Sequence, residues 1–542
     1  MSDEVLDVAV IGGGVSGVYS AWRLMTQGGK KKVAVFEAGD HIGGRLLSVT
    51  PPNIPNMKAE LGGMRILPAV QPRITKLIDV LNRGVSGPDR IETYPFPVDE
   101  DDNISYLRGV YLRLSDFSKR PGKVPYHLTF QEFGKTPGAI LVNAIEQIVP
   151  GITNSKLTED QRREMTYETV FNGKPLYQQG FWQVLLRVIS GEAYQLGLAA
   201  GGYETTITSW NAADAIPWFL SDFGIKPDYK GFRKGFQQVP LNLAERLKKA
   251  KGEIKLNAPV AGFEWKESEK IVEIHLRNGD RVKAKDVILA MPRRALELIA
   301  GESPLLQQPE VKELIKSVTP RPLFKLFTTY SNPWWLAAGV KAGRTTTDLP
   351  VRQTYYWPKD DGHPAEEGRA MLMASYDDGV NIGFWDSFRP RRGRDWRPEA
   401  RNVPEPEWYA GEDDEAGGTA QANADEAGDW REYRAPKSMV REVKRQLAII
   451  HGLAYTPNVL SASFKDWGDD PFGGGWNSWN IGVRSPDVKK KIIQPVAGVP
   501  VYICGEAYSD AQGWVEGALQ TADMMLEDKD KFGLPPLKVP KG

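Results

Sequence analysis

Three glycines near the start of the chain have the spacing of a dinucleotide-binding turn. Gly12, Gly14 and Gly17 form a Gly-x-Gly-x-x-Gly pattern, and Glu37 follows 20 residues after the last of them. In such a turn the first glycine permits a tight bend, the second lets the backbone approach a pyrophosphate, and the third lets a helix pack closely on a strand. A carboxylate at the position of Glu37 can accept hydrogen bonds from both ribose hydroxyls and disfavours a 2′-phosphate. These residues predict the binding of a dinucleotide cofactor.

The segments around the glycines provide the elements that such a turn requires. Residues 6–11 are rich in β-branched residues and predict a strand, residues 15–27 have helical periodicity, and residues 33–36 predict a second strand. This arrangement places phosphates at a helix N-terminus, where free N–H groups and the helix dipole favour anions. The unit alone does not separate NAD from FAD.

The rest of the chain divides into a helical part and several strand-rich parts. Residues 126–230 predict a mainly helical region with a long amphipathic stretch over 181–197. Further helices are expected over 239–250, 437–452 and 513–527, and strands over 254–265, 270–276, 281–290, 320–331, 368–376 and 499–504. Residues 389–435 are rich in Arg and then in Asp, Glu, Gly and Ala, which predicts an exposed, mobile insertion; a subunit contact is the alternative.

Composition limits the classes of function. A chain of 542 residues is too long for one ordinary core, so at least two domains are expected. Lys plus Arg and Asp plus Glu number 69 each, which gives no reason to expect nucleic acid or an anionic membrane as a partner. The N-terminal residues do not have the pattern of a secretory signal and no stretch of about 18 apolar residues occurs, so cytoplasmic residence is the expectation.

Cysteine and histidine usage argues against a metal centre. The single cysteine, Cys504, can form no disulfide within the chain, and the five histidines show no zinc-site spacing. We therefore expect no metal site.

Two segments far apart in the sequence resemble the flavin amine oxidase superfamily. Residues 37–45 read EAGDHIGGR, similar to the E-A-x-x-x-x-G-G-R segment of that superfamily. Residues 501–506, VYICGE, and 513–518, GWVEGA, resemble its closing FAD motif, and residues 256–260 and 286–292 also fit. The resemblance spans nearly the whole chain and implies an FAD enzyme.

The fold that this resemblance implies is α/β (α+β), with three kinds of domain. A Rossmann-like FAD-binding domain is expected from residues 1–67, 233–319 and 491–542, the last including a C-terminal tail. A β-sheet substrate-binding domain is expected from 68–125 and 320–490, and an inserted helical domain from 126–232.

The resemblance also implies which residues hold the cofactor. Gly43, Gly44 and Arg45 would lie along the pyrophosphate, and Glu506 near the phosphate and ribitol. Val260 would lie near the adenine, and Gly513, Trp514 and Val515 at the isoalloxazine. The other residues that the resemblance assigns to cofactor binding are Gly12, Gly14, Gly17, Glu37, Gly44, Arg45, Gly63, Met64, Arg65, Gly505 and Glu506. Cys504 lies in the strand before Gly505 and not in the thioether motif of monoamine oxidases, so a buried structural thiol and noncovalent FAD are expected.

Residues 59–66, AELGGMRI, are similar to the segment that identifies L-amino acid oxidases and the related monooxygenases. Arg65 would pair with the substrate carboxylate, because a planar guanidinium grips a carboxylate through two charge-assisted hydrogen bonds. Tyr376 matches the family tyrosine whose hydroxyl also meets the carboxylate, with Tyr355 and Tyr356 as rivals.

Lysine and tryptophan residues complete the expected site. Lys325 is flanked by apolar residues on a predicted strand, and the matching family lysine holds a water at flavin N5. Trp467, Trp476 and Trp514 lie beside glycines in loops and would enclose the substrate. An apolar cage excludes water and favours the neutral amine.

The resemblance therefore implies an FAD-dependent L-amino acid oxidase. It would take an L-amino acid and oxygen, pass a hydride to flavin N5, and yield a 2-oxo acid, ammonia and hydrogen peroxide. A broad or basic-leaning substrate range is expected, because Asp214 or Asp222 could receive a basic side chain, although solvated or capping carboxylates are commoner. A homodimer is expected from family habit.

Three alternatives remain open from the sequence. An L-amino acid 2-monooxygenase would decarboxylate the substrate and leave an amide, and Arg65 suits it equally well. A monoamine or polyamine oxidase is disfavoured by the Arg65 segment. A flavin-fold protein without turnover could use residues 389–435 to bind a partner, but Lys325 and the tryptophans favour catalysis.

Overall fold

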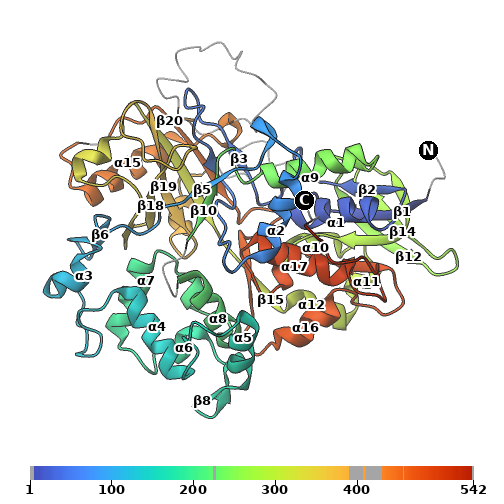
Figure 1. Ribbon diagram of the computed structural model, residues 1–542, viewed down its shortest axis with the longest axis horizontal. Helices are drawn as coiled ribbons and strands as arrows, with labels where there is room; N and C mark the ends of the chain where they lie inside the picture. Colours follow the sequence, from blue (N-terminus) through green and yellow to red (C-terminus); the bar gives the residue numbers. More distant parts are fainter. Residues whose placement is uncertain (1–4, 224–227, 390–406, 410–429, 456, 540–542) are drawn as a thin grey trace.

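The computed structural model of the chain describes residues 5–223, 228–389, 407–409, 430–455 and 457–539 (Figure 1). Two large sheets and a group of helices make up the described residues. The predicted insertion over 389–435 falls mostly outside them. Its described ends are partly packed against the protein: Trp430 is buried, and the Tyr409 hydroxyl donates to the carbonyl of Val459 at 2.6 Å. The expectation of an exposed segment is therefore wrong for Trp430 and Ala435, which are buried, whereas Glu407, Arg431 and Glu432 are exposed as expected.

The first sheet holds the predicted strand–glycine–helix–strand unit. Its strands run in the order β11 (Glu253–Lys255), β2 (Val33–Phe36), β1 (Leu6–Ile11), β14 (Arg281–Leu289), β13 (Ile271–Leu276) and β12 (Val260–Lys266), with β22 (Val501–Ile503) beside β14. The pairings among β11, β2, β1, β14 and β22 are parallel. Because parallel strands end at one edge, the residues that follow β1, β2, β14 and β22 are brought together there.

Helices cover this parallel sheet and explain its apolar strands. Helix α1 (Val15–Thr26) contacts α9 (Gln238–Lys249) and α17 (Val515–Leu526). Parallel strands covered on both faces are continuously apolar rather than alternating, and all four residues of β2 are buried. The other predicted strands and helices of this region are confirmed to within two residues at their ends, but the single strand predicted over 254–265 is wrong. It is two strands, β11 and β12, at opposite ends of the sheet order, because the chain turns between them at Asn257, which has φ +51°.

The second sheet runs β20 (Ser461–Asp466), β16 (Phe324–Tyr330), β19 (Ala370–Asp377), β18 (Gln353–Tyr356), β17 (Arg344–Thr347), β6 (Ile104–Leu107) and β7 (Val110–Arg113). Its pairings are antiparallel except that of β17 with β6. Helix α15 (Lys437–His451) contacts β19 and β6. The strand predicted over 368–376 and the helix over 437–452 are confirmed. The strand predicted over 320–331 is confirmed as β16 from Phe324, while residues 320–321 belong to β15 (Val318–Arg321) in a separate two-stranded sheet.

The helical region lies next to the second sheet (Figure 1). It contains α4 (Pro137–Ile148), α5 (Glu159–Glu168), α6 (Phe181–Leu185), α7 (Gly191–Gly201) and α8 (Ala212–Phe223). The single helix predicted over 181–197 is wrong, because α6 ends at Leu185 and a new helix begins after Ser190. The Ser190 hydroxyl accepts a hydrogen bond from the Ala193 N–H at 3.1 Å, which caps α7.

The predicted domain boundaries stay a prediction, although the strands follow the same division. Those of the first sheet come from residues 1–67, 233–319 and 491–542, and those of the second from 68–125 and 320–490. Among the helices that the structure describes, none has the length and apolar character needed to cross a bilayer.

Candidate active site

A cavity of about 760 Å³ lies where the two sheets and the helical region meet. Residues that follow β1, β2, β14 and β22 line it from the first sheet, Lys325 and Tyr376 from the second, and Tyr203 and Trp218 from the helical region. Its volume is in the range of small-molecule and cofactor sites. Within the described residues no cluster of three His, Cys, Asp or Glu side chains could hold a metal ion.

The three glycines of the turn occupy three different environments. Gly12 has φ +109°, and a Cβ there would meet the carbonyl oxygen of Ala290 at 2.5 Å. Gly14 lines the cavity, and a Cβ there would meet no protein atom within 4 Å. Gly17 does not line the cavity; its Cβ would meet the Gly12 carbonyl oxygen at 2.0 Å. Gly17 therefore serves the packing of helix on strand, and Gly14 borders open space at the N-terminus of α1.

Glu37 lies beside this turn. One of its carboxylate oxygens accepts a hydrogen bond from the Gly13 N–H at 2.6 Å and the other from the Gly39 N–H at 2.8 Å. Val260 and Arg277 line the same cavity. A carboxylate fixed next to the glycine turn, with an open helix N-terminus beyond it, fits the ribose and pyrophosphate of a dinucleotide.

Arg45 and Glu506 join the two FAD motifs across the chain. The Arg45 Nη1 atom lies 2.8 Å from the Glu506 Oε2 atom. The other oxygen of Glu506 accepts hydrogen bonds from the N–H groups of Asn477 at 2.9 Å and Gly513 at 2.7 Å. Glu506 therefore joins the loops of Arg45 and Gly513 to strand β21 (Trp476–Trp479) at the cavity wall. The remaining predicted cofactor residues on this wall are Gly44, Gly63, Met64, Gly505, Trp514 and Val515.

Arg65 is 4% exposed and lines the cavity. Its Nη1 and Nη2 atoms donate to the hydroxyls of Tyr355 at 3.3 Å and Tyr203 at 3.4 Å, and its Cζ atom lies 3.9 Å from the centre of the Tyr229 ring. Its Nε atom is buried without a hydrogen-bond partner. Among the described residues it forms no ion pair with a carboxylate. A buried cation without a direct ion pair is costly, so this arrangement favours an anionic ligand.

The charge of Arg65 is maintained by its surroundings. Burial lowers its pKa, but the nearby Tyr355, Tyr203, Tyr229 and Asp222 raise the pKa well above its ordinary value. The guanidinium therefore stays protonated in the cavity wall.

The positions of the three candidate tyrosines on their strands show which of them lines the cavity. Tyr376 lies on β19 and lines the cavity, where its neighbour across the strands is Lys325. The Tyr355 hydroxyl accepts a hydrogen bond from Arg65, but Tyr355 does not line the cavity. Tyr356 points to the opposite face of β18, because successive side chains alternate, and its hydroxyl lies 2.7 Å from the Nε2 atom of His451. Of the three, Tyr376 alone is a wall residue.

Lys325 is buried at the same wall. Its Nζ atom donates to the carbonyl oxygens of Glu60 at 3.0 Å and Gly62 at 2.5 Å, and lies 4.9 Å from the centre of the Tyr376 ring. Burial lowers the pKa of Lys325 to about 7. Burial also raises the pKa of the Glu60 carboxyl to about 7. The lysine can therefore change protonation near neutral pH.

All three predicted tryptophans line the cavity. The Trp467 indole donates to the carbonyl of Leu61 at 2.7 Å. Trp476 stacks on Trp218 of α8, with ring centres 5.9 Å apart and an angle of 12° between the planes. The Trp218 indole donates to the Gln512 carbonyl at 2.8 Å, next to Gly513.

Among the wall residues that the sequence reasoning missed are Tyr203 and Trp218. Both come from the helical region, which no motif connects to the cavity. The amphipathic face of residues 212–223 was visible in the sequence, but its orientation toward Trp476 was not.

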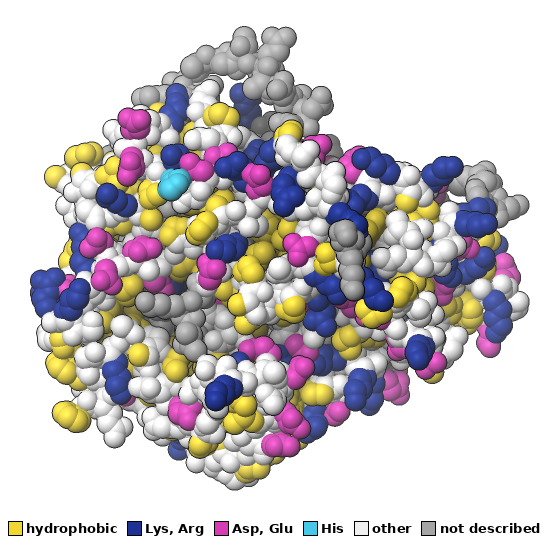
Figure 2. Space-filling view, in the orientation of Figure 1, with side chains coloured by type: hydrophobic (Ala, Val, Ile, Leu, Met, Phe, Trp, Pro, Cys, Tyr) yellow, Lys and Arg dark blue, Asp and Glu magenta, His cyan; other side chains and the backbone are white. Residues whose placement is uncertain are grey.

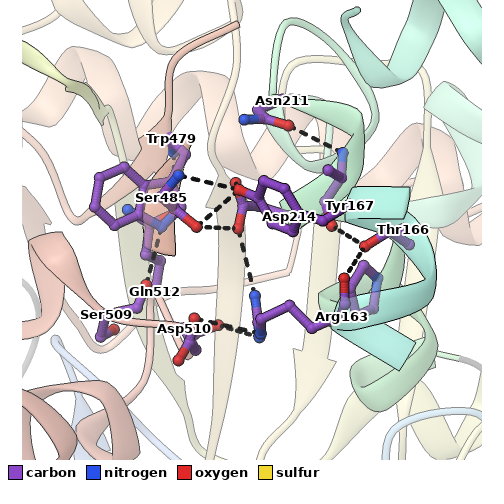
Figure 3. A network of polar contacts seen from close by, with 12 residues as sticks. Arg163, Thr166, Tyr167, Asn211, Asp214, Trp479, Ser485, Ser509, Asp510 and Gln512 are labelled. Atoms are coloured by element: carbon purple, nitrogen blue, oxygen red, sulfur yellow. Dashed lines mark hydrogen bonds and ion pairs between the residues drawn. The ribbon is translucent and has the colours of Figure 1, made fainter. Parts of the chain in front are cut away.

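Asp214 is not part of the cavity, so the hypothesis that it receives a basic substrate is wrong. Figure 3 shows it in a buried polar network with Arg163 and Ser485. Its carboxylate accepts hydrogen bonds from the hydroxyls of Tyr167 at 2.8 Å and Ser485 at 2.7 Å, and lies 3.4 Å from Arg163 Nη1. The charge of Asp214 is therefore already balanced within the protein. Asp222, by contrast, lines the cavity.

Cys504 is buried and does not line the cavity. Burial raises the pKa of its thiol to about 12. It is placed as a structural thiol.

Comparison with known proteins gives consistent matches. The family described as flavin-containing amine oxidoreductase matches residues 15–392. Aplysianin-A of Aplysia kurodai is 28% identical over 98% of this chain and 92% of its own length. Achacin of Lissachatina fulica is 25% identical over 96% and 92%. An L-amino-acid oxidase of Sistrurus catenatus edwardsii is 26% identical over 70% of this chain and 68% of its own.

Solved structures show the same fold. Wild-type putrescine oxidase bound to putrescine superposes with a TM-score of 0.63, at 20% identity, covering 96% of this chain and 98% of that one. The predicted fold class, with a Rossmann-like FAD-binding domain, is confirmed.

Proposed function

Because the chain belongs to the flavin-containing amine oxidoreductase family, we propose that it is an FAD-dependent L-amino acid oxidase. The observation that carries this proposal is Arg65, a buried guanidinium with no carboxylate partner among the described residues, in the same cavity as the glycine turn. An amine without a carboxylate would leave this cation unpaired, whereas an amino acid supplies its counter-charge.

The cavity wall fits FAD. Gly14 and the N-terminus of α1 would hold the pyrophosphate, Glu37 the ribose, and Gly513 to Val515 the isoalloxazine end, with Arg45 and Glu506 between them. Bound FAD supplies the hydride acceptor for the Cα–H of the substrate.

The protein residues place and prepare the substrate. Arg65 and Tyr376 bind the carboxylate, which fixes the direction of the Cα–H bond. Trp467, Trp476 and Trp514 exclude water, so the neutral amine, whose lone pair must assist loss of the hydride, is favoured. The substrate loses two electrons and two protons to become an imino acid, whose hydrolysis gives the 2-oxo acid and ammonia; oxygen takes the electrons and protons and becomes hydrogen peroxide.

We propose that the substrate range leans toward basic side chains through Asp222. Its carboxylate is buried at the cavity wall and accepts a hydrogen bond from the Tyr229 hydroxyl at 2.6 Å. In the part of the chain that the structure describes, no lysine or arginine forms an ion pair with it. Burial raises the pKa of Asp222, while Arg65 and the hydrogen bond from Tyr229 lower it; a cationic side chain of a substrate would further favour the carboxylate form.

The proposal is tested with the purified holoenzyme under anaerobic conditions. Adding mixed L-amino acids is expected to bleach the oxidised flavin, and adding the corresponding D-amino acids is not. Under air, the products are then identified. A 2-oxo acid with hydrogen peroxide supports the oxidase, an amide supports the monooxygenase, and bleaching only by amines without a carboxylate contradicts the proposal.

We further propose a homodimer resident in the cytoplasm. The dimer is supported by the resemblance to the family, and the location by the single cysteine, a usage that suits a reducing compartment. Light scattering after size-exclusion chromatography tests the first, and localisation of a C-terminally tagged chain tests the second.

A further inference from the structure

The helical region contributes the phenol of Tyr203 to the surroundings of Arg65. We propose that Tyr203 is a further specificity-determining residue, whose hydroxyl binds the substrate carboxylate together with Arg65 and Tyr376. This inference rests on the proposed function, because it assumes that the substrate is an amino acid.

The contacts of Tyr203 place it at the expected carboxylate position. Its hydroxyl accepts a hydrogen bond from Arg65 Nη2 at 3.4 Å, and its ring meets that of Tyr376 edge to face, with centres 5.3 Å apart and an angle of 89°. It lines the cavity beside both residues. A carboxylate that binds Arg65 and Tyr376 therefore comes within reach of Tyr203.

The protonation of Tyr203 suits this role. Burial, followed by the nearby Tyr355 and Tyr376, raises the pKa of Tyr203 well above its ordinary value. The phenol is therefore neutral and carries a proton. Since Arg65 donates to its oxygen, the O–H group can act as a donor, and a substrate carboxylate would compete for it with Tyr376, whose pKa a hydrogen bond with Tyr203 lowers.

The backbone on both sides of Tyr203 is fixed by the second sheet. On one side, the Gln353 Nε2 atom donates to the carbonyl of Gly202 at 2.9 Å. On the other, the Asp378 carboxylate accepts from the N–H groups of Glu204 at 2.8 Å and Thr205 at 3.1 Å. Gly202 has φ +84°, and a Cβ there would meet the Gln353 side chain at 2.5 Å. The approach of this turn to the sheet thus requires glycine.

This arrangement has a consequence for selectivity. Asp378 lies two residues after Tyr376, so one strand end positions both tyrosines. The substrate carboxylate would then be recognised by residues of both the second sheet and the helical region. Selection of amino acids over amines would depend on this contact as well as on Arg65.

The test compares Tyr203→Phe with wild type as holoenzymes. Benzoate, an unreactive carboxylate, is titrated while the visible flavin spectrum is followed, and L-leucine and isoamylamine are compared as substrates. We expect benzoate to bind roughly 10- to 100-fold more weakly, as for loss of a hydrogen bond to a charged group. KM for L-leucine should rise by a similar factor with kcat changed less, and the kinetic constants for isoamylamine should not change.

Tyr194→Phe is the matched control. Tyr194 lies on α7, its hydroxyl donates to the carbonyl of Ile207 at 3.1 Å, and it does not line the cavity. It should leave benzoate binding unchanged. If Tyr203→Phe does not fold, Tyr203→Met also removes the hydroxyl and fills the space with a flexible side chain.

The outcomes separate this inference from the proposed function. Unchanged benzoate binding and KM in Tyr203→Phe, with wild type still oxidising L-leucine, would overturn the role of Tyr203 alone. Equal weakening for L-leucine and isoamylamine would also overturn it, because that indicates a general structural effect. Wild type that oxidises isoamylamine but no amino acid would overturn the proposed function itself.

Discussion

Replacing Arg65 with methionine should abolish carboxylate binding without destabilising the protein. Two charge-assisted hydrogen bonds to a carboxylate, at about 1.5–3 kcal/mol each, amount to about 3–6 kcal/mol. The expected loss in kcat/KM for L-leucine is therefore roughly 10²- to 10⁴-fold, with a much smaller effect on isoamylamine. Rapid-mixing anaerobic reduction of the flavin measures both.

The stability part of this prediction follows from the contacts of Arg65. Its removal forfeits a cation–π contact with Tyr229 worth about 0.5–2 kcal/mol and two long hydrogen bonds to tyrosine hydroxyls. It also relieves the buried, unpaired Nε–H, which costs about 1–3 kcal/mol. These effects nearly cancel, so the melting temperature should stay within about 3 °C of wild type.

Arg163→Met is the matched control for stability. Arg163 is also a largely enclosed arginine, with 13% of its side chain exposed, but it pairs with Asp214 at 3.4 Å and Asp510 at 3.3 Å. Breaking such pairs costs about 3–5 kcal/mol, so this variant should melt clearly lower. A fall of the same size in Arg65→Met, or an unchanged kcat/KM for L-leucine, would refute the interpretation of Arg65 as an unpaired anion receptor.

Three further changes test other parts of the site. Gly14→Ala should fold but purify with little flavin, because its Cβ enters open cavity space, whereas Gly17→Ala should fold poorly because its Cβ meets backbone; visible absorbance and circular dichroism distinguish them. Asp222→Asn should lower the preference for L-lysine over L-leucine roughly 10-fold or more, measured as a ratio of kcat/KM values, and an unchanged ratio contradicts the basic-leaning range. Lys325→Met should slow reoxidation by oxygen roughly 10²- to 10³-fold, because the buried Lys325 ammonium would offset negative charge on the reduced flavin. Because the Lys325 pKa is lowered to about 7, wild-type reoxidation should slow as the pH rises through 7 and the ammonium is lost, while a pH-independent wild-type rate contradicts this role.

Several features could be read from the sequence because they are local. The glycine turn needs three glycines of fixed spacing between a strand and a helix, and the structure assigns Gly12, Gly14 and Gly17 three distinct environments. Arg65 and Lys325 were identified from their immediate neighbours, and both are buried at the cavity. The helix over 181–197 was wrong because one apolar pattern continues across two helices, and Ser190 decides the break.

The tertiary structure decided which side chains meet across long separations. The hydrogen bond from Arg65 to Tyr203 joins residues 138 positions apart, and no local pattern reports such a contact. Strand register decided that Tyr376 lines the cavity and Tyr356 faces away, because a shift of one residue reverses the face. Likewise, Asp214 and Asp222 lie eight residues apart on the same helix. Only the tertiary packing places Asp214 beside Arg163, which balances its charge, and Asp222 at the cavity wall. The sequence thus determined the kinds of chemical group available, and the fold determined which of them face the same space, because burial and pairing depend on neighbours that the chain brings together only on folding.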